Sequence, residues 1–310
     1  MNAVGAESAS PPPSIAVADE VAPSARSRLF GFLGVVLSAA IIARAGMEYR
    51  DLRFDTVAAM LPTTAGFWLL YWIYYLQGPL LDWVIFRHLW NVPFWSGITA
   101  LMRKLVSNEL VLSYLGEAQF YAWVRARANL SAAPFGAIKD VAILSALIGN
   151  AATVIMLAIA WPLVSAGNFG ASTKSVFISL GVVLLISCGI LIFRKKLFSL
   201  DRHELWFISS IHAFRIVVFI AFSAFLWHLV LPEVSVGLWM MLATLRMLVS
   251  RLPLLPNKDI IFTGVAVFLL GRDLEVAALM TMMAAVTLAS HILVGVVTGI
   301  IGMVETRRST

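Results

Sequence analysis

The chain has 310 residues, of which 60% are hydrophobic and only 13% are charged. Soluble domains have roughly 45–50% apolar and roughly 25% charged residues, so this composition cannot cover a water-exposed surface and excludes a soluble globular protein. The net charge of +6 does not indicate nucleic-acid binding, because no basic surface with interleaved aromatic residues accompanies it. Basic loops that face anionic lipid explain that charge, and we expect an integral membrane protein.

The sequence begins with a tail, residues 1–27, that is rich in Ala, Ser and Pro and is expected to be disordered. A transmembrane helical domain follows over residues 28–304, and residues 305–310 form a C-terminal tail. A spanning helix needs about 20 apolar residues, and the chain has about seven or eight hydrophobic segments. The predicted fold is all-α, a polytopic membrane helix bundle. The spanning segments are expected at about Leu29–Gly46, Val57–Gln77, Val141–Val164, Ser175–Phe193, Leu205–Leu231, Val234–Ser250 and Leu274–Val304.

Two further stretches are predicted to be interfacial or re-entrant. Residues 96–127 are amphipathic and basic, without a long apolar run. In residues 252–271 two prolines interrupt the helix. The apolar run that follows them, Ile260–Leu270, has about 11 residues and is too short to cross a bilayer upright.

The distribution of basic residues predicts the orientation. With the N-terminus in the cytoplasm of a bacterial inner (plasma) membrane, most Lys and Arg residues fall in cytoplasmic loops, as the positive-inside rule requires. The side of the C-terminus stays open. If Ile260–Leu270 dips in and returns, Arg307 and Arg308 lie outside, and if it crosses, they lie inside.

Charged residues at membrane depth are the candidate functional residues, because lipid penalises them. Basic residues with Glu117 on the amphipathic stretch would suit a phospholipid head group or, alternatively, simple anchoring to anionic lipid. Arg215 lies inside the fifth segment, either facing a cavity or snorkelling to the surface. The proline break is either a substrate site or a plain turn. The candidate head-group residues are Arg103, Lys104, Glu117, Arg125, Arg215, Arg246, Arg251, Lys258 and Asp259.

Single polar residues inside the segments are interpreted differently. Asn150 with Ser145, and His291, are expected to form hydrogen bonds between helices. The single cysteine, Cys188, lies in an apolar run. The sequence has no catalytic motif, and we expect neither an enzyme nor a cofactor or metal site.

Two motifs resemble the flippase-like transmembrane family that includes the membrane half of lysylphosphatidylglycerol synthetases. One is Tyr114-Leu-Gly116-Glu117 leading to Arg125-Ala-Arg127, where the family has a Gly-Glu pair in an amphipathic segment before an Arg-rich end. The other is Arg251-Leu-Pro-Leu-Leu-Pro256 before a short apolar run and a long final helix, where the family has a re-entrant break. That break carries several glycines in the family, whereas here the first glycine is Gly264.

The resemblance implies movement of lipids between leaflets, and we expect the soluble aminoacyl-transfer domain of those synthetases to be lacking. Membrane lipids, anionic ones in particular, are the expected partners. A non-catalytic scaffold that partners a cell-envelope or lipid-biosynthesis enzyme is the alternative, and a lipid-modifying enzyme is a third hypothesis. A cavity lined by the candidate residues would favour translocation, and a dry bundle would favour the scaffold.

Overall fold

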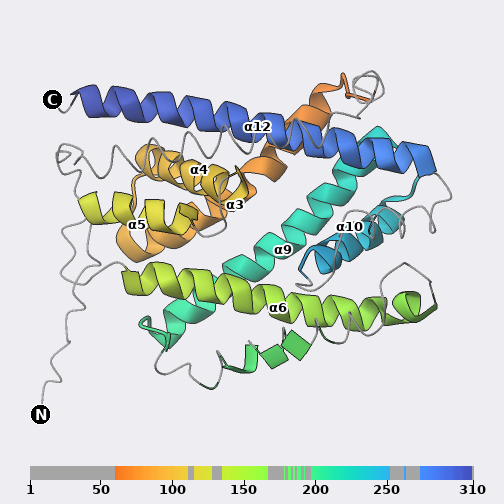
Figure 1. The fold of residues 1–310 in the computed structure, drawn as a ribbon, viewed down its shortest axis with the longest axis horizontal. Coiled ribbons are helices and arrows are strands. Elements are labelled where there is room, and N and C mark those ends of the chain that lie inside the picture. Colours follow the sequence, from red (N-terminus) through yellow and green to blue (C-terminus); the bar gives the residue numbers. More distant parts are fainter. Residues whose placement is uncertain are drawn as a thin grey trace, which may run out of the picture.

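The computed structural model describes, apart from a few positions between 178 and 192 and Phe262, residues 60–110, 115–127, 135–166, 197–251 and 273–308. Within these ranges every regular element is a helix, so the all-α prediction is confirmed for the described part of the chain. The helices are α3 (Ala65–Trp90), α4 (Phe94–Leu110), α5 (Leu115–Arg127), α6 (Phe135–Ala166), α9 (Arg202–Val230), α10 (Val236–Arg251) and α12 (Asp273–Arg308) (Figure 1).

Three described helices are long and apolar enough to cross a membrane. The stretches that meet this criterion are Phe135–Ile159 in α6, Arg202–Val230 in α9 and Ala278–Ile301 in α12. They coincide with three of the predicted spanning segments, which supports a membrane protein. The first predicted segment and most of the fourth, together with nearly all of the Ile260–Leu270 run, lie outside the described residues.

The helix α3 extends further than the sequence predicted. The second segment was expected to end at Gln77, but α3 continues through Pro79 to Trp90. A proline inside a helix removes one backbone hydrogen bond, and here the buried residues beyond it, including Ile85 and Phe86, outweigh that loss. The helix ends at Asn91, which has a left-handed backbone (φ 54°) and donates its N–H to the carbonyl of Arg87 at 2.8 Å.

The predicted interfacial stretch 96–127 forms two helices, α4 and α5, that pack against each other. Helix α4 also packs on α3 and α12, and α9 packs on α3, α6 and α10. In Figure 1, α12 and α6 lie along opposite edges of the molecule, and α9 crosses obliquely between them. The pair α4 and α5 therefore packs within the bundle.

The start of α9 is fixed by carboxylates. Asp140 on α6 is fully buried and accepts the backbone N–H groups of Ser199 and Leu200 at 2.6 and 2.9 Å. Asp201 is the N-cap and accepts the N–H of Glu204 at 3.0 Å. These bonds fix the N-terminal end of α9 against α6, and with it the direction in which the polar side chains of α9 point.

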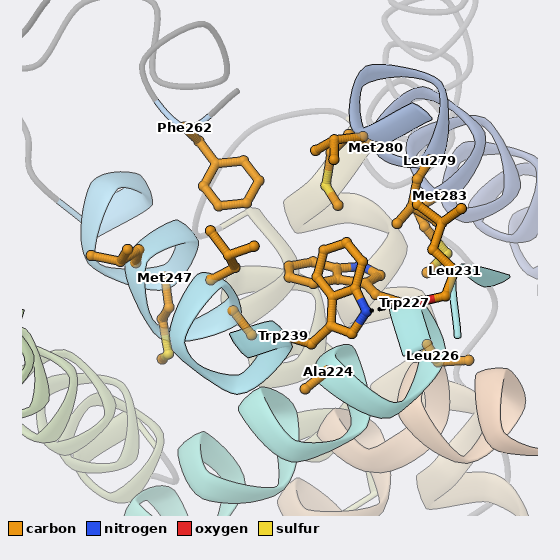
Figure 2. Close-up of a cluster of buried hydrophobic side chains, with 14 of the residues drawn as sticks. Ala224, Leu226, Trp227, Leu231, Trp239, Met247, Phe262, Leu279, Met280 and Met283 are labelled. Atoms are coloured by element: carbon orange, nitrogen blue, oxygen red, sulfur yellow. Dashed lines mark hydrogen bonds between the residues drawn. The ribbon is translucent and has the colours of Figure 1, made fainter. Parts of the chain in front are cut away.

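Two apolar clusters form the core. One surrounds Trp227 and Trp239, whose rings meet edge to face at 5.6 Å, with methionines of α12 beside them (Figure 2). The other surrounds Phe86 and Phe120, whose ring centroids are 4.5 Å apart. On α3 the first cluster ends at Tyr75, and the second begins at Ile85. The stretch between them carries the candidate site.

Polar contacts join α12 to its neighbours inside the apolar region. Tyr71 donates to the hydroxyl of Ser290 at 2.7 Å, and the Tyr75 hydroxyl lies 2.8 Å from Nδ1 of His291. The expected interhelical role of His291 is thus confirmed. Asn150 likewise donates to Ser187 at 3.1 Å.

Candidate functional site

A cavity of about 310 Å³ lies among α3, α4, α5, α6 and α9. Part of its wall is apolar and comes from the second core cluster, including Phe86, Leu101 and Phe120. The rest is polar and is contributed by all five helices. The polar lining residues are Asp82, Lys104, Asn108, Glu109, Glu117, Ser145, His212 and Arg215.

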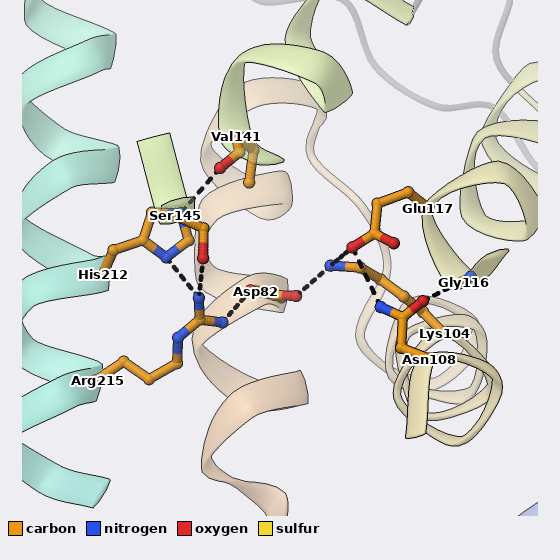
Figure 3. A network of polar contacts seen from close by, with 9 residues as sticks. All are labelled: Asp82, Lys104, Asn108, Gly116, Glu117, Val141, Ser145, His212 and Arg215. Carbon is orange, nitrogen blue, oxygen red and sulfur yellow. Dashed lines mark hydrogen bonds and ion pairs between the residues drawn. The ribbon is translucent and has the colours of Figure 1, made fainter. Parts of the chain in front are cut away.

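Asp82 on α3 is the centre of the polar lining (Figure 3). Its side chain is 9% exposed, and each of its oxygens meets a different cation: Lys104 Nζ lies 2.6 Å from Oδ2, and Arg215 Nη1 lies 2.9 Å from Oδ1. Two cations thus flank this buried carboxylate and stabilise its charged form. The carboxylate is therefore ionised and links α3 to both α4 and α9.

Arg215 is held by two further polar groups, one of which is itself held by a backbone carbonyl. Its Nη2 donates to the Ser145 hydroxyl at 2.9 Å and lies 2.8 Å from Nδ1 of His212. The other ring nitrogen of His212, Nε2, lies 3.2 Å from the carbonyl oxygen of Val141. Because a carbonyl only accepts hydrogen bonds, the proton belongs on Nε2, which leaves Nδ1 as an acceptor for Arg215.

Glu117 lies opposite Asp82 at the start of α5. Its Oε1 is 3.6 Å from Lys104 Nζ and accepts Asn108 Nδ2 at 3.2 Å (Figure 3). Its Oε2 is buried and has no hydrogen-bond partner among the described residues. Lys104 therefore lies between two carboxylates, and Glu117 keeps one unused acceptor.

The junction of α4 and α5 is tight. The N–H of Gly116, one of the first in α5, has no partner within that helix and donates to Asn108 Oδ1 at 2.7 Å. A Cβ atom at Gly116 would lie 2.2 Å from the carbonyl oxygen of Lys104. Only glycine permits α5 to approach the backbone of α4 this closely, and the close packing brings Glu117 to the cavity.

Three of the predicted candidate residues meet in the cavity, namely Lys104, Glu117 and Arg215. Arg103 does not line it. The residue donates instead to the carbonyl oxygen of Thr298 on α12, at 2.7 Å from Nη2 and 3.1 Å from Nε. Adjacent residues on a helix point in directions about 100° apart, so Arg103 contacts α12 while Lys104 contacts α3.

The other predicted residues are also outside the cavity lining. Arg125 is exposed on α5. Arg246 packs in the Trp227 cluster. Arg251 is the last residue of α10, and Lys258 and Asp259 lie outside the described residues. The structure therefore does not bring Arg103, Arg125 and Arg246 together with Lys104, Glu117 and Arg215 in this cavity.

Sequence reasoning missed Asp82, the residue that joins the two cavity cations. The signal was present: an acidic residue stands in the apolar run Leu80-Leu81-Asp82-Trp83-Val84. Ending the second segment at Gln77 placed Asp82 outside a helix and outside the search for charges at membrane depth.

The fold and the site define the class of protein. It is a membrane protein, helical throughout the part that the structure describes, with a small cavity lined by charged residues. No family model, curated protein or solved structure matches the chain. The resemblance to the flippase-like family therefore stays a prediction that rests on the motif residues.

Proposed function

We propose that this chain is a lipid translocase-like protein of the inner membrane, without catalytic activity, in which the cavity around Asp82, Lys104, Glu117 and Arg215 receives a lipid head group. The observation that carries the proposal is this cluster of one buried and three half-buried charges, which surrounds a hollow in a chain with three candidate spans. A hollow of about 310 Å³ is at the small end of ligand sites, which span roughly 300–1,000 Å³. It suits a head group, while the acyl chains stay in the bilayer.

The charge balance indicates which head group would bind. The two cations, Lys104 and Arg215, already share Asp82, so a bare anion would have to compete with that carboxylate. The unused acceptor on Glu117 and the exposed carboxylate of Glu109 favour a ligand that also donates hydrogen bonds. An anionic phospholipid whose head group carries hydroxyl or amine donors, such as phosphatidylglycerol, meets both conditions.

The arrangement of helix ends supports the proposed topology. In Figure 1 the C-terminal end of α12 lies on the same side of the molecule as the starts of α6 and α9. Lys139 and Arg202 mark those starts, and the positive-inside rule assigns that side to the cytoplasm. The C-terminus would then lie in the cytoplasm, on the side that the sequence predicts for the N-terminus.

The proposal is tested by lipid movement in liposomes. Purified protein is reconstituted with fluorescent phosphatidylglycerol, and the fraction of label that external dithionite quenches is followed over time. The variant Glu117→Gln keeps the side-chain shape but removes the charged acceptor, and it should slow movement about tenfold or more, because a charge-assisted hydrogen bond is worth about 1.5–3 kcal/mol. Arg125→Gln, on the exposed side of the same helix, is the matched control and should keep the wild-type rate. Equal rates for wild type and Glu117→Gln would refute the assignment of this cavity.

A second function is favoured by the internal pairing of the charges. Lys104 and Arg215 are both neutralised within the protein, as in a structural network that fixes helices in a scaffold for a membrane enzyme. On that reading Glu117→Gln would change stability alone, liposomes would show no lipid movement above protein-free controls, and a lipid-biosynthesis or cell-envelope enzyme would co-purify with the chain.

A further inference from the structure

We infer that Arg246 marks a second anion-binding site, separate from the cavity, that takes a phosphate group. Arg246 lies on α10 and does not line the cavity around Asp82. Its guanidinium carbon is 5.8 Å from the ring centroids of both Trp227 and Phe262. These rings belong to the aromatic cluster of Figure 2, where Met280 of α12 lies close to Phe262.

The partners of Arg246 leave most of its hydrogen-bonding capacity unused. A guanidinium has five N–H donors, and here Nη1 has only the thioether sulfur of Met280, at 3.4 Å. A thioether is a weak acceptor, and the aromatic faces attract the charge without accepting strong hydrogen bonds. No carboxylate is paired with Arg246 within the described ranges.

Arg246 therefore differs from Arg215, whose donors are occupied by Asp82, Ser145 and His212. A half-buried cation at membrane depth marks a functional site when no counter-ion accompanies it. The two aromatic rings attract the guanidinium without using its N–H donors, so that the planar fork stays available for two parallel hydrogen bonds to a phosphate.

The ligand class is a phosphate oxyanion, either on a lipid or free in solution. Binding at Arg246 does not require that lipid moves through the cavity, so this inference stands independently of the proposed function. The two are separated by their variants, because Glu117→Gln tests the cavity and Arg246→Met tests the second site.

The test is ligand binding to the full chain in detergent micelles. Retention of phosphatidylglycerol and of diacylglycerol, which lacks the phosphate, is measured by native mass spectrometry, and inorganic phosphate is titrated in a thermal-shift assay. In a Glu117→Gln background, which removes the charged acceptor of the cavity, Arg246→Met should weaken phosphatidylglycerol retention about tenfold, while diacylglycerol stays weakly bound to both proteins. A loss confined to inorganic phosphate would identify a free anion as the ligand, and a loss confined to the lipid would identify the head group.

Two controls keep the test sharp. Arg87 lies 5.0 Å over the ring of Trp83 but is exposed at the end of α3. Arg87→Met therefore removes an arginine that contacts an aromatic ring and leaves the proposed site at Arg246 intact. It should bind like the wild type. Arg246→Lys keeps the positive charge but loses the planar guanidinium with its paired N–H donors, and it should bind the phosphate ligand with intermediate strength. Wild-type binding of both ligands by Arg246→Met, or an equal loss in Arg87→Met, would overturn the inference.

Discussion

Arg215 and Arg246 lie in two regions of this molecule that stabilise an arginine in opposite ways. Around Arg215 the helices supply a carboxylate, a hydroxyl and an imidazole, and they leave a hollow beside them. Around Arg246 they supply two aromatic rings and a sulfur. The first region holds its charges as a mutually neutral network, whereas the second holds a charge for which no described residue supplies a counter-ion. A charge at membrane depth can thus hold helices together or remain available for a ligand, and its partners decide which.

The largest effect that this comparison predicts is from Asp82→Ala. The change leaves Lys104 and Arg215 in a buried site without their shared carboxylate, and breaking such a pair costs about 3 kcal/mol or more. The free energy of unfolding, measured in mixed micelles of increasing denaturing detergent, should fall by that amount. A loss below about 1 kcal/mol would mean that water screens the network as it does at a surface.

The next effect separates the two arginines directly. Arg215→Met leaves Asp82 with Lys104 alone and should destabilise the protein by about 2 kcal/mol. Arg246→Met leaves no carboxylate of the described residues unpaired. It loses a cation–π contact worth about 0.5–2 kcal/mol, and the removal of a costly, half-buried charge offsets that loss. The stability of Arg246→Met should stay within about 1 kcal/mol of the wild type. Equal losses in the two variants would remove the distinction between the regions.

Glycine substitutions test how tightly the cavity region is built. Gly116→Ala places a Cβ against the backbone of Lys104 and should cost about 1–3 kcal/mol, as overpacking does. Gly78 also lines the cavity, but a Cβ there meets nothing within 4 Å apart from its chain neighbours. Gly78→Ala should stay within about 1 kcal/mol of the wild type, because the gain from alanine in a helix is offset by the contact of its Cβ with the ring of the following Pro79. Thermal unfolding of the two variants measures the difference.

The smallest expected effect is a dependence of stability on pH. Asp82 pairs with Lys104 and Arg215 only while it is ionised, so its protonation in acid removes both ion pairs and the stability that they contribute. Unfolding measured at decreasing pH should show an acid loss in the wild type that Asp82→Asn lacks.

The apolar helices could be predicted closely, and the cavity only in part. Long apolar runs placed α6, α9 and α12 within a few residues of their observed bounds, because hydropathy depends on local composition. Arg215 was singled out because charge is rare in such runs, and Lys104 and Glu117 because they lie on an amphipathic stretch that would face head groups. The second segment was ended too early, at Gln77, because the residues that follow contain no long apolar run, and the packing of α3 beyond Gln77 was not visible in the local pattern.

The sequence by itself determined that the protein lies in lipid and that its chain is helical. In lipid every backbone polar group must form a hydrogen bond within the structure, and the length of an apolar run decides whether the helix can cross the bilayer. Only the tertiary structure decided which charges meet. Asp82 and Arg215 are 133 residues apart in the chain yet form an ion pair, and Arg103 and Lys104, adjacent in the chain, bind different neighbours. The pairing of side chains depends on how helices cross and rotate against one another, and that geometry arises from packing over the whole bundle.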